Sequence, residues 1–131
     1  MNRLEERKIV FEIVFSALFN DDKPIEDVIE LYKESKDIQD ISEYVNSTVF
    51  GIHNNIQSID DRIKATIVGR KFDRLDNICL TALRYAVYEI FYNDSIPDNV
   101  AINEAIELTK KYDDTLCSYV HANLAIIIKS K

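Results

Sequence analysis

The chain has 131 residues and a formal net charge of −7 at pH 7, with 47% hydrophobic and 30% charged residues. This balance excludes a disordered chain, and the length suits one domain with its own core rather than two. Because the sequence has only two glycines and two prolines, it lacks the turn residues that a multi-stranded sheet requires, and we predict one all-helical domain over residues 1–131.

Apolar residues recur at helical spacing along the first half of the chain. The first helix is predicted from about residue 3 to the break at NDDKP, and the second follows Pro24, which suits a first helical turn. A third apolar stripe runs from Ile41 to Ile52. A fourth helix is expected to begin with Ser58 as its N-cap and to close at Gly69.

Three more helices are predicted in the second half, which gives about seven in all. The first of them is capped near Asp76 and extends to about Tyr92, and it is apolar on more than one side, so we expect it to be the central helix. The stretch IPDNVAINEAIELTKKY, residues 96–112, predicts a helix entered through a proline. Apolar residues from Leu116 to Ile128 predict the last helix.

Negative charge is concentrated in one segment of the chain. Residues 20–43 hold nine acidic residues against three lysines, whereas acids and bases balance over residues 1–19. We therefore expect this acidic segment to repel phosphate and to attract basic partners.

The sequence lacks the residue patterns that are typical of enzymes and metal sites. Cys79 and Cys117 are isolated, and His53 and His121 lie on different predicted helices. We predict no catalytic residue, no metal site and no cofactor, and we expect two reduced thiols in a cytoplasmic protein. Because Glu12 interrupts the apolar stretch near the amino terminus, we expect neither a signal peptide nor a membrane span there.

The first predicted helix has a pattern that favours RNA binding. Arg7, Phe11 and Phe15 follow at i, i+4 and i+8, so a cation and aromatic rings can share one face. That combination suits single-stranded RNA, whose bases stack on rings while its phosphates pair with arginine. The alternative, that both Phe rings pack into the core, is equally open.

Four segments are distinctive in combination: ERKIVFEIVF, VNSTVFGIHNNIQSIDDRI, DRLDNICLTALRYAVYEIFY and IPDNVAINEAIELTKKY. Their order and spacing resemble the NusB family of bacterial transcription antitermination and ribosomal RNA biogenesis factors, and the last is similar to that family's IP-x-x-V-A-I-N-E-A segment. The first match places Arg7 on a family arginine and Phe15 on a family Tyr or Phe. Near the carboxyl end, Tyr119 keeps an aromatic residue of the family.

This resemblance implies about seven helices in two small packed bundles. It also implies that the protein binds the boxA element of nascent ribosomal RNA, within the transcription elongation complex, as a heterodimer with the ribosomal protein NusE. The residues expected to contact RNA are Arg3, Arg7, Lys8, Phe15 and Tyr119.

Other residues are expected to serve the protein partner or the fold. Contacts with the protein partner are expected at Arg70, Arg74 and Glu89, with Glu89 facing solvent or the partner. Tyr88 is expected to be half-buried with its hydroxyl hydrogen-bonded. We expect Asn103 and Glu104 to make buried or interhelical hydrogen bonds, without a chemical role.

The sequence leaves alternatives to this interpretation open. A helical interaction module, homodimeric or bound to another partner and with weak or lost RNA binding, is favoured by the acidic segment and the sparse arginines. NusB-like domains also precede the catalytic domain of some ribosomal RNA cytosine methyltransferases. We expect no such enzyme here, because a chain ending at Lys131 has no room for a cofactor-binding domain.

Overall fold

In the computed structural model, which describes residues 1–67 and 69–131, the chain forms α-helices joined by loops and short 3₁₀ turns. The described residues contain no strand and seven α-helices, which confirms the all-helical prediction and the expected number. The helices belong to two compact units, Met1–Asn54 and Asn55–Lys131. We call these the amino-terminal and the carboxy-terminal unit.

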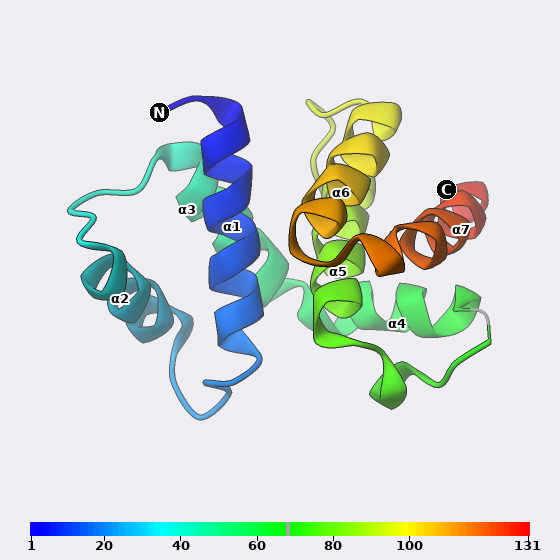
Figure 1. Ribbon diagram of the computed structural model, residues 1–131, viewed down its shortest axis with the longest axis horizontal. Helices are drawn as coiled ribbons and strands as arrows, with labels where there is room; N and C mark the ends of the chain where they lie inside the picture. The colour runs from blue at the N-terminus through cyan, green and yellow to red at the C-terminus, as the bar shows by residue number, and fades with distance from the viewer. Residues whose placement is uncertain (68) are drawn as a thin grey trace. The chain divides into compact units, whose positions relative to one another are not determined.

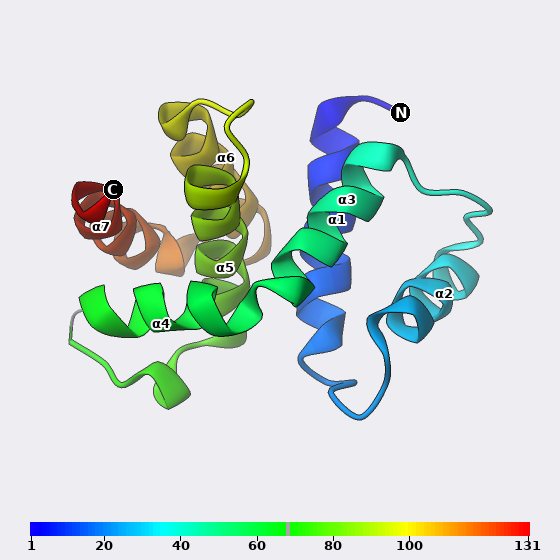
Figure 2. The ribbon, with the colours of Figure 1, turned by 180° about the vertical axis from the view of Figure 1, so that it is seen from behind.

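The amino-terminal unit contains α1 (Arg3–Ala17), α2 (Ile25–Lys36) and α3 (Glu43–Asn54). Within this unit, α1 packs against both of the other helices, as Figures 1 and 2 show from opposite sides. The core is formed by apolar residues at helical spacing, including Val10, Val14, Val28, Val45 and Val49.

Local sequence signals explain where these helices begin and end. The Asn2 side chain caps α1 by accepting a hydrogen bond of 2.9 Å from the Glu5 backbone N–H. Pro24 immediately precedes α2, whose first turn is acidic and whose last turn carries Lys33 and Lys36. Both charge placements stabilise the helix through favourable interaction with its dipole. The helix then stops at Asp37, which adopts a left-handed conformation with φ of 54°.

The carboxy-terminal unit is built around α5 (Asn77–Tyr92), which packs against α4 (Ile56–Thr66), α6 (Asp98–Asp113) and α7 (Cys117–Ile127). Figure 2 shows α6 running beside α5 and α4 crossing its amino-terminal end. Three 3₁₀ turns complete the unit: η1 (Phe72–Arg74), η2 (Asp114–Leu116) and η3 (Ile128–Ser130).

The prediction that α5 is the central helix is confirmed. Ten of its 16 residues are buried, and Leu83 is 0% exposed. Its amino terminus is capped as expected, since the Asp76 carboxylate accepts a hydrogen bond of 2.8 Å from the Ile78 backbone N–H.

Three local expectations are wrong. Helix α4 begins at Ile56, so Ser58 lies inside its first turn, where its hydroxyl donates to the Asn55 carbonyl over 3.1 Å instead of capping the helix. Asn103 is exposed on α6 and makes no buried hydrogen bond with any residue that the structure describes, because its position faces away from the buried stripe of Ala101, Ala105 and Leu108. The expected closure of α4 at Gly69 is also wrong, because α4 ends at Thr66 with the extended Ile67 as its C-cap, and Gly69, with a positive φ of 76°, lies in the loop that follows.

Among the described residues, no helix combines the length and the apolar character that crossing a membrane requires.

Candidate nucleic-acid interface

The three cations predicted to bind RNA near the amino terminus differ in exposure. Arg7 is buried, with 3% of its surface exposed, whereas Arg3 and Lys8 are exposed. The burial follows from helix geometry, because Arg7 lies three and four residues before Val10 and Phe11, which are 0% and 1% exposed. The prediction that Arg7 contacts RNA therefore disagrees with the structure, in which its guanidinium belongs to the interior.

Arg3 lies over the ring of Tyr44 on α3, with 3.7 Å between its guanidinium carbon and the ring centroid. Its Nε is also 3.6 Å from a carboxylate oxygen of Glu6, and Glu6 in turn accepts a hydrogen bond from the Ser42 hydroxyl. The positive charge of Arg3 is thus shared with a carboxylate of the same helix. This pairing weakens its attraction for a phosphate.

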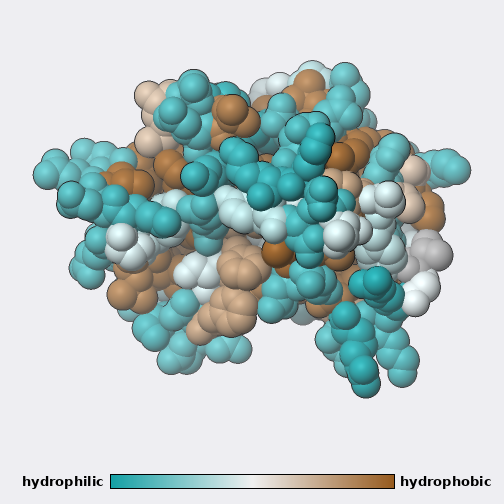
Figure 3. Space-filling view, viewed as in Figure 1, coloured by the Kyte–Doolittle hydropathy of each residue, from teal (hydrophilic) through white to brown (hydrophobic). Residues whose placement is uncertain are grey.

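The aromatic residues of α1 divide between the core and the surface. Phe11 is buried, so Arg7, Phe11 and Phe15 do not form one exposed face. Phe15 is half-buried, and its ring centroid lies 5.3 Å from that of Phe19, which is 62% exposed. Figure 3 shows hydrophobic surface over this carboxy-terminal part of α1. The ring pair offers a surface on which a base can stack.

In the carboxy-terminal unit, Arg70 lies over the ring of Tyr119 on α7, with 4.8 Å between guanidinium carbon and ring centroid. Arg70 is exposed and Tyr119 is half-buried. The Tyr119 carbonyl accepts a hydrogen bond of 2.8 Å from the side chain of buried Asn123, which helps to fix this part of α7. The structure therefore brings together an arginine that we assigned to a protein partner and an aromatic residue that we assigned to RNA.

Two further cations of this unit lie against aromatic rings. The Lys64 ammonium is 4.9 Å from the Phe72 centroid, and the Arg62 guanidinium carbon is 3.9 Å from the Phe91 centroid. Sequence reasoning missed these pairs, because their members come from different segments of the chain. The available signal was the charge of residues 62–74, which hold five cations and one acid.

The other two residues expected to contact a protein partner differ in their exposure to solvent. Arg74 is exposed in η1, as a contact residue should be. Glu89 is 1% exposed, so the expectation that it faces solvent or a partner is wrong. It sits on α5, which is enclosed on several sides, next to the buried Ile90.

Tyr88 is half-buried, as expected, and its ring stacks on that of Tyr92 with centroids 5.9 Å apart. Burial raises the pKa of its hydroxyl, and the neighbouring Glu89 carboxylate raises it further. The expected hydrogen bond of this hydroxyl is not found among the residues that the structure describes.

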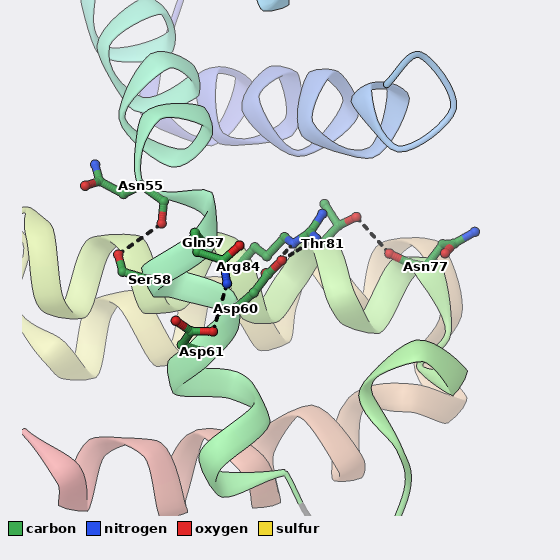
Figure 4. A network of polar contacts seen from close by, with 8 residues as sticks. All are labelled: Asn55, Gln57, Ser58, Asp60, Asp61, Asn77, Thr81 and Arg84. Atoms are coloured by element: carbon green, nitrogen blue, oxygen red, sulfur yellow. Dashed lines mark hydrogen bonds and ion pairs between the residues drawn. The ribbon is translucent and has the colours of Figure 1, made fainter. Parts of the chain in front are cut away.

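A polar network fixes α4 against α5 (Figure 4). Arg84 donates two hydrogen bonds of 2.9 Å to the two carboxylate oxygens of Asp60. On α5 itself, the Thr81 hydroxyl donates to the Asn77 carbonyl over 2.7 Å, and on α4 the Gln57 side chain donates to Asp61 over 3.0 Å. Because Lys64 follows Asp60 on α4, the Arg84–Asp60 pair also fixes the helix that carries this cation.

Across residues 1–67 and 69–131, no group of three or more His, Cys, Asp or Glu side chains is arranged to hold a metal ion. The two cysteines are free thiols.

Comparisons with known proteins agree with this fold. The sequence profile of the NusB family matches residues 4–122. The chain is 36% identical to the transcription antitermination protein NusB of Clostridium acetobutylicum, over 99% of this chain and 97% of that protein. It is 35% identical to the corresponding protein of Clostridium novyi, over 99% of this chain and 100% of that protein.

Solved structures resemble the chain over almost its full length. Comparison with T. maritima NusB gives a TM-score of 0.84 at 28% identity, covering 98% of this chain and 92% of that one. A crystal structure of antitermination factors NusB and NusE in complex with dsRNA gives 0.85 at 24% identity, covering all of both chains, and supports the fold. Both Clostridium relatives are named as transcription antitermination proteins. On the strength of this full-length match, the chain belongs to the NusB family.

Proposed function

We propose that this chain is a transcription antitermination factor that binds boxA-type RNA of nascent ribosomal RNA transcripts together with the ribosomal protein NusE. Its relatives are named as transcription antitermination proteins, and a structural neighbour was crystallised with NusE and dsRNA. In this role the chain works within the elongation complex in the bacterial cytoplasm.

The observation that carries the proposal is that most of the amino-terminal cations are either buried or paired with a carboxylate. Arg7 is buried, and Arg3 shares its charge with Glu6. Lys8 is exposed and has no carboxylate partner among the described residues, but one lysine neutralises only one phosphate. The amino-terminal unit therefore has little charge with which to hold RNA by itself.

The acidic surface of the same unit supports dependence on a basic partner. Glu26, Asp27, Glu30 and Glu34 are exposed along α2, and the whole chain has a net charge of −7. Such a surface repels RNA but speeds the encounter with a basic ribosomal protein. The resulting complex brings the partner's positive charge to the RNA, so RNA binding is strong only in the complex.

Within that complex, we assign direct RNA contacts to Arg3, Lys8, Phe15 and Tyr119, and contacts with the protein partner to Arg74. Phe15 and Tyr119 supply half-buried rings for base stacking, while Arg3 and Lys8 supply exposed charge. Arg7 acts through the fold of α1 and not on the RNA.

A binding titration tests this function. Fluorescein-labelled boxA-like RNA is titrated with the chain together with NusE, and a scrambled RNA of equal length and base composition serves as the control. Tighter binding of the boxA-like RNA supports the proposal. Equal and weak binding of both RNAs would favour the other candidate function, a helical interaction module without RNA binding, which the buried Arg7 and the acidic α2 also fit.

A further inference from the structure

The guanidinium of Arg70 lies over the ring of Tyr119 on α7. Its central carbon lies 4.8 Å from the ring centroid. In a stacked arginine the five N–H groups point outward in the guanidinium plane, so they can reach a phosphate without breaking the contact with the ring. Arg70 is exposed, and within the described part of the chain no carboxylate pairs with it.

A second cation–aromatic pair lies close by along the chain. Arg70 and Phe72 flank Lys71, whose backbone is extended with φ of −81° and ψ of 149°. Phe72 in turn lies beneath Lys64 of α4, 4.9 Å from its ammonium. The cation of one pair, Arg70, and the ring of the other, Phe72, are therefore only two residues apart in sequence, and Lys71 between them is exposed.

The charge of this region is opposite to that of the chain as a whole. Residues 62–74 contain five cations and a single acid, Asp73, in a chain whose net charge is −7. A basic ribosomal protein would be repelled here and attracted to the acidic α2 instead. A polyanion with stackable bases matches both the positive charge and the aromatic rings.

We infer that Arg70 and Tyr119 act together as one RNA-binding platform of the carboxy-terminal unit, with Lys64 and Lys71 as flanking phosphate contacts. The inference rests on the proposed function and moves Arg70 from the protein-partner surface to the RNA surface. A base stacks on the platform, while the in-plane N–H groups of Arg70 bind the adjacent phosphate.

The test measures binding of fluorescein-labelled boxA-like RNA to the complex of the full chain with NusE at several salt concentrations. The variants are Arg70→Ala, Tyr119→Ala, the double variant and Arg70→Lys. Lys23→Ala is the matched control, since it removes one cation from the acidic segment, where Lys23 lies beside Asp22. Binding of NusE without RNA is measured for each variant, and circular dichroism checks that each is folded.

We expect Arg70→Ala to weaken RNA binding about tenfold and to lower the slope of log affinity against log salt by about one. Because the two residues form one platform, the double variant should lose less than the product of the single losses. Arg70→Lys should keep the salt slope while losing affinity, because lysine retains the charge but not the planar stack. Lys23→Ala should leave RNA binding unchanged.

Three results would overturn the inference. If the unmodified complex binds RNA tightly and Arg70→Ala binds it equally well, the platform is wrong while the proposed function stands. If Arg70→Ala weakens NusE binding in the absence of RNA by the same factor, the residue belongs to the protein interface. If the unmodified complex binds no RNA, the proposed function fails and the platform fails with it.

Discussion

Arg84 on α5 and Asp60 on α4 form a bidentate ion pair, in which the arginine Nε and Nη2 each lie 2.9 Å from a different carboxylate oxygen (Figure 4). The side chains are 14% and 15% exposed, so solvent screens the pair only weakly. Since α4 carries Arg62 and Lys64, this pair links the central helix to the cationic part of the carboxy-terminal unit.

Replacing Arg84 by Ala should lower the free energy of unfolding by about 2 to 3 kcal/mol, because it leaves a mostly buried carboxylate without its partner. Urea denaturation measures the loss. Asp61→Ala is the matched control, since Asp61 is the exposed neighbour of Asp60 and bonds only to Gln57 of its own helix among the described residues. A smaller loss for Arg84→Ala than for Asp61→Ala would contradict the structural role.

Leu83→Ala tests the burial of α5. The side chain is 0% exposed, so its truncation should cost about 2 to 5 kcal/mol through lost burial and the cavity left behind. Leu31→Ala provides the comparison, because Leu31 is 45% exposed on α2. Its truncation should lower the free energy of unfolding much less. The measurement is again urea denaturation. A loss below about 1 kcal/mol for Leu83→Ala would contradict the central placement of α5.

Arg7 and Lys8 are adjacent on α1, but we expect substitution of Arg7 to affect stability and substitution of Lys8 to affect RNA binding. Arg7→Ala should lower stability by about 2 kcal/mol, because it removes a buried, interacting guanidinium. Lys8→Ala should leave stability close to that of the unmodified chain but weaken RNA binding by the NusE complex. Thermal melts and RNA titrations of both variants check this contrast. The account would be contradicted if Arg7→Ala were as stable as the unmodified chain yet lost RNA binding.

The buried thiol of Cys79 should make the protein less stable at alkaline pH. Burial, with a smaller contribution from Asp76, raises the pKa of its thiol from 9.0 to about 11. Between these values the unfolded chain loses the proton while the folded chain keeps it, so the stabilisation is complete below pH 9 and falls as the pH rises.

Comparison with Cys79→Ala isolates this contribution from those of other titrating groups. The stability of the unmodified chain relative to the variant should fall by about 2 kcal/mol between pH 8 and pH 11. Urea denaturation at both pH values measures the difference. Parallel pH profiles for the two proteins would show that this thiol does not titrate differently on folding.

Much of the fold could be predicted because apolar spacing and capping residues act locally. Asp76 was recognised as the cap of α5, and it forms the expected bond to the Ile78 backbone. The cap of α4 was misplaced at Ser58, because a serine fits equally well inside a first turn when its hydroxyl can bond to a preceding carbonyl.

The candidate site was harder to predict because burial and side-chain pairing depend on the tertiary structure. The spacing of Arg7 with Phe15 and the family resemblance of Glu89 predict contact residues, yet each of the two lies on a face whose neighbours are buried. The burial of Arg7 could have been predicted from its spacing, since it lies on the same apolar stripe as Val10 and Phe11. No spacing rule connects Arg70 with Tyr119 or Arg3 with Tyr44, because those contacts form only when segments far apart in the sequence pack together.

The central claim is that RNA binding depends on NusE, and the most direct measurement is the RNA affinity of the chain with and without NusE, by isothermal titration at several salt concentrations. We predict weak binding with a shallow salt dependence for the isolated chain, and tight binding with a steeper dependence for the complex. NusE should tighten RNA binding by the same factor by which RNA tightens NusE binding. Equal RNA affinity in the presence and absence of NusE would contradict the account.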